Sequence, residues 1–475
     1  MNHAAEYSAG RAGETATATA LAILEQRFGP RLSRGRAVRE QHGHTLTWIA
    51  NQPPDAVVFA ETADDVADVV RVCAEHGVPL IAFGAGTSIE GQVNAPLGGI
   101  SLDLSAMNRI ISVNDSDLDC VVEAGVTRQQ LNDHLHDRGL FFPVDPGASN
   151  ATLGGMASTR ASGTTTVRYG TMRDNVINVT AVMADGSVVR TARRARKSAS
   201  GYDLTHLLVG SEGTLGVITE LTLRLYGIPE SILAAVCPFE TIEGACNAVI
   251  TAIQLGLGIA RMELLDEVQV EACNSYSGLA LKVAPTLFLE FHGSPAGTRE
   301  QVESFREIAE GEGALGFDWA EQVEDRGRLW KARHDAYYAG RSLRPGVDAF
   351  ATDVCVPISR LAECVRETHA DILENSLIAP LVGHVGDGNF HVLPLVDMAD
   401  ADEVARVSGF LERLVARALA MDGTCTGEHG VVMGKIEFLQ AEHGPGLEVM
   451  RTIKRALDPT GLLNPGKMLG NLQRE

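Results

Sequence analysis

Two histidines flank a glycine-rich stretch in the last quarter of the chain. Residues 383–391 read Gly-His-Val-Gly-Asp-Gly-Asn-Phe-His, and an Asp-Gly pair between two extended segments is a strong signal for a tight hairpin. With Asp387-Gly388 as a two-residue loop, His384 lies opposite His391, and directly opposed residues have Cβ atoms about 5 Å apart. Two imidazoles at that spacing could bind one divalent metal ion.

A carboxylate that could complete this metal site lies further along the chain. Residues 423–430 read Gly-Thr-Cys-Thr-Gly-Glu-His-Gly and contain Glu428. Two histidines and one glutamate with an open coordination position are a known catalytic metal arrangement. The alternative is a glycine-rich hairpin whose histidines bond to the backbone, and the histidine spacing alone does not separate the two.

Composition bounds the class of protein. The chain has 475 residues, so two or three domains are expected. Its formal net charge of −21 argues against nucleic acid or an anionic membrane surface as the main partner. No apolar run reaches the roughly 18 residues needed to span a bilayer. The eight cysteines form no Cys-x-x-Cys pair, which argues against zinc ribbons and iron–sulfur ligation and fits a reducing cytosol.

The first half of the chain is expected to contain strands and helices joined by glycine-rich loops. Residues 55–86 read as a βαβ unit whose helix stops at Gly77, and its second strand enters residues 84–91, Gly-Ala-Gly-Thr-Ser-Ile-Glu-Gly. Backbone N–H groups in such a loop can converge on a diphosphate, although a flexible turn is the alternative. Two more small-residue stretches follow at 143–170 and 210–219. Three such loops suggest one extended cofactor that contacts all of them.

The pattern changes near Pro229. Between residues 232 and 319, strands and helices follow the order βαββαβ, which is typical of a ferredoxin-like layer. A helix is expected over 326–341, with Trp330, Arg333 and Tyr337 on one face at i, i+3 and i+7. A guanidinium matches a carboxylate in a bidentate geometry, so Arg333 is the candidate partner of an anionic substrate. The alternative is an ordinary arginine on the helix surface.

Six motifs occur together in the order seen in one flavoprotein family. They are Gly84–Gly91, Ala151–Gly163, Gly210–Thr219, Gly383–His391, Gly423–Gly430 and Leu463–Lys467. Through them, the chain from about Pro53 to Leu469 resembles the FAD-linked 2-hydroxy-acid dehydrogenases of the vanillyl-alcohol-oxidase superfamily. Within it, the resemblance is closest to cytochrome-type D-lactate dehydrogenases and glycolate oxidase flavin subunits. The fold that this implies is α+β: a PCMH-type FAD-binding domain of two α/β subdomains, and a ferredoxin-like cap domain with C-terminal helices.

The resemblance also implies domain boundaries and cofactor contacts. The expected segments are an N-terminal helical lead-in at 1–50, the FAD-binding domain at 51–229, the substrate or cap domain at 230–457 and a C-terminal segment at 458–475 that returns to the flavin. The implied FAD contacts are Gly84, Gly86, Thr87 and Ser88 at the diphosphate, Thr152, Gly155, Ser158 and Ser162 along the flavin, Glu212, Gly216 and Ile218 toward the adenosine, and Asn464 near the ring. No histidine lies between Leu80 and Ile100, so the FAD is expected to be non-covalent.

The same resemblance makes His384, His391 and Glu428 the ligands of a divalent metal, Zn²⁺ or Mn²⁺, and His429 the general base. The chemistry agrees, because oxidation of a 2-hydroxy acid removes a proton from the hydroxyl and passes a hydride to flavin N5. A bound cation lowers the pKa of that hydroxyl, and a nearby histidine can accept its proton. Arg333 and Tyr337 are the expected substrate-binding residues.

Two positions bear on the choice of substrate. Relatives that act on 2-hydroxyglutarate tend to carry a lysine just before the Asp-Val of residues 353–354 and an asparagine two places after the second metal histidine. Here the first place holds Ala351 or Thr352 and the second holds Leu393. A monocarboxylate is therefore expected, with D-lactate oxidised to pyruvate or a somewhat larger apolar D-2-hydroxy acid. A glycolate oxidase flavin subunit and a D-2-hydroxyglutarate dehydrogenase are the alternatives.

The chain carries no iron–sulfur or haem motif, so electrons are expected to leave FAD directly for a cytochrome, a quinone or an electron-transfer flavoprotein. A cytoplasmic location is expected, with peripheral attachment at the inner membrane as an alternative, and the oligomeric state stays open, with a homodimer among the options. A hypothesis of another class is a metal-dependent hydrolase built on the two histidines and Glu428. It leaves the glycine-rich loops of residues 84–219 unexplained.

Overall fold

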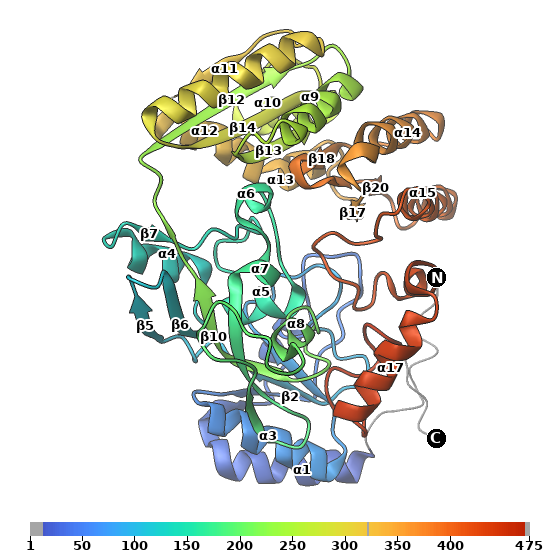
Figure 1. The fold of residues 1–475 in the computed structure, drawn as a ribbon. Helices are drawn as coiled ribbons and strands as arrows, with labels where there is room; N and C mark the ends of the chain where they lie inside the picture. Colours follow the sequence, from blue (N-terminus) through green and yellow to red (C-terminus); the bar gives the residue numbers. More distant parts are fainter. Residues whose placement is uncertain (1–12, 321–322, 471–475) are drawn as a thin grey trace. The chain divides into compact units, whose positions relative to one another are not determined.

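The computed structural model describes residues 13–320 and 323–470, which form two compact units (Figure 1). Unit 1 contains the described residues up to Ser162, then Thr171–Gly227 and the segment from Glu428 onward. Unit 2 contains Gly163–Gly170 and Ile228–Gly427. The chain therefore enters unit 2 twice and returns to unit 1 after Gly427.

The first sheet of unit 1 has the strand order β1-β2-β4-β3. Its strands are β1 (Leu32–Ser33), β2 (Ala56–Phe59), β3 (Leu80–Phe83) and β4 (Ile100–Asp103). Helix α3 (Ala63–His76) ends at Gly77, whose φ of 63° is the left-handed conformation that favours glycine. The expected βαβ unit is confirmed, but β4 lies between its two strands and pairs with both in parallel.

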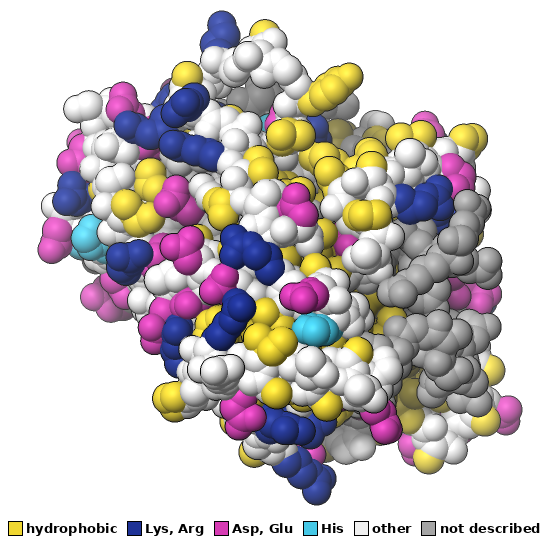
Figure 2. All heavy atoms as spheres, turned by 90° about the horizontal axis from the view of Figure 1, so that it is seen from below, with side chains coloured by type: hydrophobic (Ala, Val, Ile, Leu, Met, Phe, Trp, Pro, Cys, Tyr) yellow, Lys and Arg dark blue, Asp and Glu magenta, His cyan; other side chains and the backbone are white. Residues whose placement is uncertain are grey.

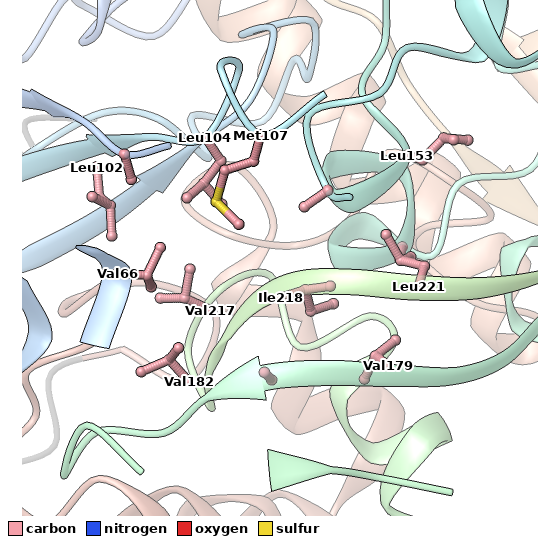
Figure 3. Close-up of a cluster of buried hydrophobic side chains, with 14 of the residues drawn as sticks. Val66, Leu102, Leu104, Met107, Leu153, Val179, Val182, Val217, Ile218 and Leu221 are labelled. Atoms are coloured by element: carbon pink, nitrogen blue, oxygen red, sulfur yellow. The ribbon is translucent and has the colours of Figure 1, made fainter. Parts of the chain in front are cut away.

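The second sheet of unit 1 is antiparallel, with the order β5-β6-β10-β8-β9. Its strands are β5 (Ile110–Asn114), β6 (Asp119–Glu123), β8 (Val176–Val182), β9 (Val188–Arg190) and β10 (Val217–Arg224). Buried side chains of both subdomains form one hydrophobic cluster, in which Val66 and Leu102 lie near Val182 and Val217 (Figure 3). This shared core fixes the loops that leave the two sheets.

The remaining elements of unit 1 are short, apart from its first and last helices. They are α1 (Glu14–Phe28), η3 (Gly29–Arg31), α2 (Arg36–Gln41), α4 (Arg128–His136), β7 (Leu140–Phe141), α5 (Leu153–Thr159), α7 (Met172–Asn175), α8 (Leu204–Leu208), β11 (Tyr226–Gly227), η6 (Ile436–Phe438), α16 (Leu439–His443) and α17 (Gly446–Leu457). The first helix packs on α3. It lies within the N-terminal segment in which a helical lead-in was expected.

Unit 2 is built on a sheet with the order β15-β12-β14-β13-β18-β19-β17. The elements are α6 (Thr166–Tyr169), β12 (Ser231–Pro238), α9 (Ile242–Gln254), β13 (Ile259–Leu265), α10 (Glu267–Ser277), β14 (Thr286–Gly293), α11 (Pro295–Gly311), β15 (Asp318–Ala320), β17 (Val354–Cys355), β18 (Leu381–Gly383) and β19 (Asn389–Val392). The ferredoxin-like order of β15, β12, β14 and β13 is confirmed. Helix α10 was not predicted from the sequence; Asp266 caps it by accepting from the Gln269 N–H.

The C-terminal part of unit 2 adds helices to this sheet. Its elements are α12 (Val323–His334), α13 (Ala336–Ser342), β16 (Asp348–Ala349), η4 (Ile358–Arg360), α14 (Leu361–Glu374), η5 (Val385–Asp387), β20 (Leu395–Val396) and α15 (Ala401–Ala420). The single helix expected over 326–341 is wrong, because the helix is interrupted at Asp335. Trp330 is buried in a cluster with Leu265, whereas Tyr337 packs with Leu393 in another cluster. Trp330 and Tyr337 therefore pack in different hydrophobic clusters and do not lie on one shared helix face.

The expected two-residue loop at Asp387-Gly388 is also wrong. Strands β18 and β19 pair Val382 with His391, so His384 lies beyond the ladder and is followed by the 3₁₀ turn η5. Gly388 has φ 80°, and a Cβ there would lie 2.1 Å from the Val356 carbonyl oxygen. The close approach of β17 favours the longer loop over a tight hairpin.

Charged side chains are interspersed on the surface. On the face drawn in Figure 2, Lys and Arg lie among Asp and Glu. Within the described ranges, no helix is long and apolar enough to cross a membrane.

Candidate flavin cavity and histidine cluster

Unit 1 contains a cavity of about 240 Å³ where its glycine-rich loops meet. Every residue that the resemblance assigns to FAD lines it: Gly84, Gly86, Thr87, Ser88, Thr152, Gly155, Ser158, Ser162, Glu212, Gly216, Ile218 and Asn464. Glu428 and His429 line the same cavity. The loops that follow β3, precede and follow α5, and precede β10 therefore share one space, as the sequence pattern suggested.

The segments around the cavity approach one another closely at glycines. A Cβ on Gly84 would lie 2.2 Å from the Thr152 hydroxyl oxygen, and one on Gly154 would lie 2.6 Å from the Ala124 Cβ. The Thr152 hydroxyl caps α5 by accepting from the Gly155 N–H at 3.3 Å. Glycine at these two positions lets the loop after β3 and helix α5 pack closely on their neighbours, and the small residues around the cavity leave room for a flat, extended group such as a flavin.

Asn464 adds a polar group to this fit. Its N–H donates to the Leu80 carbonyl at 2.8 Å, and its side-chain amide donates to the Glu212 carbonyl at 2.7 Å. Its Oδ1 is buried and has no hydrogen-bond partner among the described residues. A buried acceptor without a partner costs about 1–3 kcal/mol, and a donor on a bound cofactor would remove that cost.

Glu212 holds the loop that follows His429. The residue is buried at φ 52°, and its carboxylate accepts from the Val431 N–H at 2.9 Å and the Val432 N–H at 3.2 Å. Burial raises the pKa of Glu212 to about 7, against the lowering effect of these two donors. A Cβ on Gly430 would lie 2.7 Å from the Glu212 Oε1, so the loop requires glycine there. The role of Glu212 at the adenosine stays a prediction.

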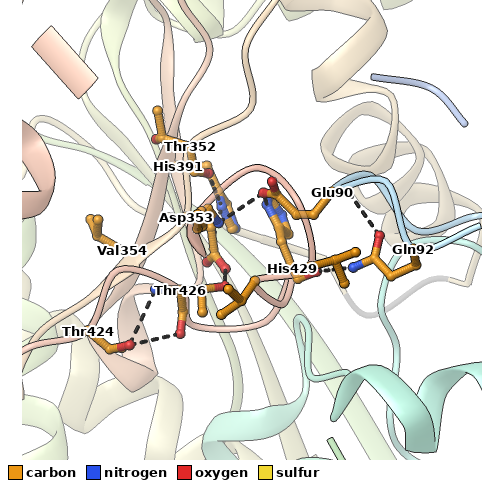
Figure 4. Close-up of polar contacts among 12 residues, drawn as sticks. Glu90, Gln92, Thr352, Asp353, Val354, His391, Thr424, Thr426 and His429 are labelled. Carbon is orange, nitrogen blue, oxygen red and sulfur yellow. Dashed lines mark hydrogen bonds and ion pairs between the residues drawn. The ribbon is translucent and has the colours of Figure 1, made fainter. Parts of the chain in front are cut away.

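The side chains of Glu428 and His429 contact different partners. Glu428 Oε2 accepts from the Ser162 hydroxyl at 2.7 Å. The His429 carbonyl accepts from the Gln92 side-chain amide at 2.8 Å, and His429 Nδ1 lies 3.8 Å from Glu90 Oε1 (Figure 4). Glu428 therefore contacts Ser162, whereas His429 lies beside Glu90 and Gln92, although the two residues are consecutive and line the same cavity.

In unit 2, the imidazoles of His384 and His391 lie with ring centroids 5.3 Å apart and an interplanar angle of 81°. His384 Nδ1 lies 2.8 Å from a Glu263 carboxylate oxygen, and His391 Nδ1 lies 2.9 Å from the Thr352 carbonyl oxygen. A proton on each Nδ1 puts the lone pair on Nε2, which is how metal-ligating histidines are commonly oriented. The chemistry of this pair fits a divalent metal.

Glu263 is a functional candidate that was not predicted from the sequence. The pairing of Leu264 with Gly383 places Glu263 next to His384 at the following register position. Glu263 is fully buried and also forms an ion pair with Arg333. No sequence motif marks it, because the pairing of β13 with β18 joins distant parts of the chain.

Arg333 is 8% exposed, so the alternative of an arginine on the helix surface is wrong. Arg333 forms an ion pair with Glu263. Its buried Nε has no hydrogen-bond partner among the described residues. Tyr337 is partly buried beside Leu393, and burial raises the pKa of its hydroxyl. The substrate-binding roles of Arg333 and Tyr337 stay predictions.

A second carboxylate of unit 2 faces His391. Asp353 Oδ1 lies 3.7 Å from His391 Nδ1. Asp353 also accepts from the Asn389 amide at 2.8 Å and from the Thr426 hydroxyl at 2.7 Å (Figure 4). These bonds tie the strand that carries His391 to the segment just before Glu428.

Comparison with known proteins identifies the family. Residues 54–192 match the FAD binding domain, and residues 228–468 match the C-terminal domain of FAD linked oxidases. The chain is 53% identical to the probable mitochondrial D-lactate dehydrogenase of Danio rerio, over 92% of this chain and 89% of that one. It is 46% identical to the mitochondrial D-lactate dehydrogenase [cytochrome] of Arabidopsis thaliana, over 88% and 73%.

A solved structure of p-cresol methylhydroxylase with substrate bound has a TM-score of 0.81 at 17% identity, over 97% of this chain and 98% of that one. This likeness shows the fold alone. The expected α+β fold with a PCMH-type domain is confirmed, as is the resemblance to FAD-linked hydroxy-acid dehydrogenases. The chain belongs to the FAD-linked oxidase family.

Proposed function

We propose that the protein oxidises D-lactate to pyruvate with FAD and a divalent metal. The observation that carries the proposal is the presence of Glu428 and His429 on the wall of the cavity that all the predicted FAD residues line. When bound, FAD supplies a two-electron acceptor for the hydride from C2 of the substrate. The hydroxyl proton goes to His429, which balances the reaction.

His429 suits this role because its backbone is fixed. The Gln92 amide donates to its carbonyl, and the Glu212 carboxylate accepts from the N–H groups of Val431 and Val432, two and three residues further on. A base must lie within hydrogen-bond reach of the proton that it removes. A fixed backbone limits how far its ring can move.

His384, His391 and Glu428 are the proposed metal ligands, with Zn²⁺ or Mn²⁺ as the ion. Glu263 and the Thr352 carbonyl support the two histidines through Nδ1. A Cβ on Gly427 would lie 2.3 Å from the Asn389 amide nitrogen, so the residue before Glu428 packs on the strand that carries His391. A bound cation would lower the pKa of the substrate hydroxyl.

A monocarboxylate fits the surroundings of the proposed substrate residues. Arg333 supplies the guanidinium, and Tyr337 packs in an apolar cluster with Ala349, Leu393 and Leu395. Leu393 stands where an asparagine occurs in relatives that act on 2-hydroxyglutarate. An apolar side chain there gives a second carboxylate no partner.

The names of the relatives also bear on acceptor and location. Those of Arabidopsis thaliana and two yeasts include "[cytochrome]" and "mitochondrial". We therefore propose a cytochrome as the electron acceptor. We also propose that the protein is located where that cytochrome occurs, which is the mitochondrion for these relatives, and not in the cytoplasm expected from the cysteines. Reduction of cytochrome by the purified enzyme, compared with quinone and flavoprotein acceptors, tests this.

Anaerobic substrate addition tests the function. The purified protein should show flavin absorbance, release its flavin on acid precipitation and lose the oxidised-flavin absorbance with D-lactate. Glycolate and D-2-hydroxyglutarate should act more slowly. His384→Ala should keep the flavin absorbance and lose the bleaching. A colourless protein would exclude the flavin enzyme, and faster bleaching by D-2-hydroxyglutarate would exclude the proposed substrate.

A further inference from the structure

Glu90 is a buried carboxylate of unit 1 to which the sequence pattern assigned no role. It lies in the first glycine-rich loop, and it is 5% exposed. Its Oε1 lies 3.8 Å from His429 Nδ1 and 2.9 Å from Lys435 Nζ. A buried carboxylate is costly unless it is paired. Lys435 supplies the paired charge, and the same carboxylate oxygen also faces the His429 imidazole.

Backbone bonds fix Glu90 and the His429 loop together. The Glu90 N–H donates to Gln92 Oε1 at 2.9 Å, and the same Gln92 side chain donates to the His429 carbonyl at 2.8 Å. The Glu90 carbonyl accepts from the Met433 N–H at 3.2 Å. The Gln92 carbonyl in turn accepts from the buried Lys467 at 2.5 Å. Hydrogen bonds through Gln92 and Met433 therefore link the Glu90 backbone to the loop that carries His429.

The loop also makes room for the carboxylate. A Cβ on Gly434 would lie 2.2 Å from Glu90 Oε2. The missing side chain at Gly434 lets the Glu90 carboxylate lie against the loop, with Oε1 toward both His429 and Lys435. This packing determines where the carboxylate sits relative to the imidazole.

We propose that Glu90 is a positioning residue that orients the His429 imidazole. It acts through Nδ1, favouring the tautomer that carries its proton there and presents the Nε2 lone pair to the substrate hydroxyl. The separation of 3.8 Å exceeds a hydrogen bond, but catalytic hydrogen bonds are often long before substrate binds. A carboxylate that holds a histidine in its working tautomer is a general device. The inference rests on the proposed role of His429 as base.

Glu90→Gln in the FAD-loaded enzyme is the first test. The change keeps the size and removes the charge. We expect kcat for D-lactate to fall about 10–100-fold, the range seen when a carboxylate that supports a histidine is removed. KM should change less than about threefold, and flavin content and thermal unfolding should stay close to the wild type. Loss of flavin or of stability with an unchanged kcat per bound flavin would show a structural role only.

A readout independent of turnover is the ¹⁵N signal of His429. Histidine-selective labelling at one fixed pH, with His429→Gln to assign the signal, should show a changed tautomer in Glu90→Gln. An identical His429 signal in the wild type and in Glu90→Gln would overturn the inference. If the wild type is not bleached by D-lactate, the proposed function fails, but this signal still reports whether Glu90 orients the ring.

Gly434→Ala gives a second route to the same carboxylate without changing any charge. Its methyl group should displace Glu90 and lower kcat to a similar extent, and the double variant should be no worse than either single variant, because contacting residues are not additive. Glu403→Gln is the matched control: it breaks a partly buried ion pair with Arg344 in unit 2 and should leave kcat unchanged. Fully additive losses would contradict a shared mechanism.

Discussion

Glu263 connects two side chains that the sequence pattern assigned to different tasks. It lies 2.8 Å from His384 Nδ1 and pairs with Arg333. We predict that Glu263→Gln lowers metal affinity about 10–100-fold, because a supporting carboxylate both orients a ligating imidazole and raises its basicity. Metal retained against a competing chelator measures this. Glu267→Gln is the control, because it removes a carboxylate from His369 at 3.2 Å; equal retention in both variants would disprove the role.

Residues in contiguous motifs could be predicted from the sequence, whereas isolated partners could not. The cavity residues of unit 1 come from loops whose glycines and hydroxyls are visible as runs, and all of them line one space. Glu90 and Glu263 are single carboxylates among 61 acidic residues. Their importance arises from long-range packing beside His429 and His384, which no local pattern records.

At the scale of elements, the loop after β3 must meet the first turn of α5 without a side chain between them. A Cβ on Gly84 would lie 2.2 Å from the Thr152 hydroxyl. We predict that Gly84→Ala displaces this hydroxyl, costs about 1 kcal/mol in lost capping and lowers FAD affinity at least about tenfold. The ratio of flavin to protein absorbance after dilution measures it. Gly227→Ala, where no atom lies within 4 Å, should keep its flavin; equal losses would contradict the steric argument.

Helix α12 shows why one face of a helix can be misread. Trp330 is 7% exposed in a cluster with Leu265 and Phe288, and Arg261 lies 4.7 Å above its ring. We predict that Trp330→Ala destabilises unit 2 by about 3–5 kcal/mol and leaves substrate preference unchanged. Urea unfolding and relative rates with D-lactate and a larger D-2-hydroxy acid check both parts. A shifted preference in a stable variant would instead place Trp330 at the substrate.

The order of strands followed from the sequence better than their register did. The βαββαβ order of residues 232–319 predicted the ferredoxin-like layer, because each strand and each helix can be recognised from its own local sequence. The loop between His384 and His391 was predicted as a tight turn because Asp387-Gly388 favours one. The neighbouring strand β17 and the Val356 carbonyl at Gly388 outweigh that local preference. Register depends on such tertiary contacts.

Over the whole molecule, buried carboxylates of opposite tendency shape the dependence of stability on pH. Burial raises the pKa of Glu212 in unit 1 and of Asp266 in unit 2 to about 7. In contrast, burial raises the pKa of Asp371, but its bonds to Arg413 and Arg417 outweigh this and hold it below its ordinary value. Ionisation of Glu212 and Asp266 therefore lowers the free energy of unfolding as pH rises, whereas ionised Asp371 raises it.

Asp266 allows the sign to be tested. Its folded pKa lies above its unfolded value near 3.8, so the folded state binds more protons between pH 4 and 7, and stability falls as pH rises through that window. Its carboxylate accepts from the Gln269 and Leu381 N–H groups, and Glu267 raises its pKa while His369 lowers it. Asp266→Asn keeps the helix cap without a titrating group. We predict that it lessens the loss of stability between pH 5 and pH 8, measured as the urea midpoint at each pH with excess FAD.

Asp371→Asn is the control: both its folded and unfolded pKa values lie below pH 5, so it should lower the midpoint equally at pH 5 and pH 8. A steeper loss in Asp266→Asn than in the wild type would show that the charged form of Asp266 stabilises the fold.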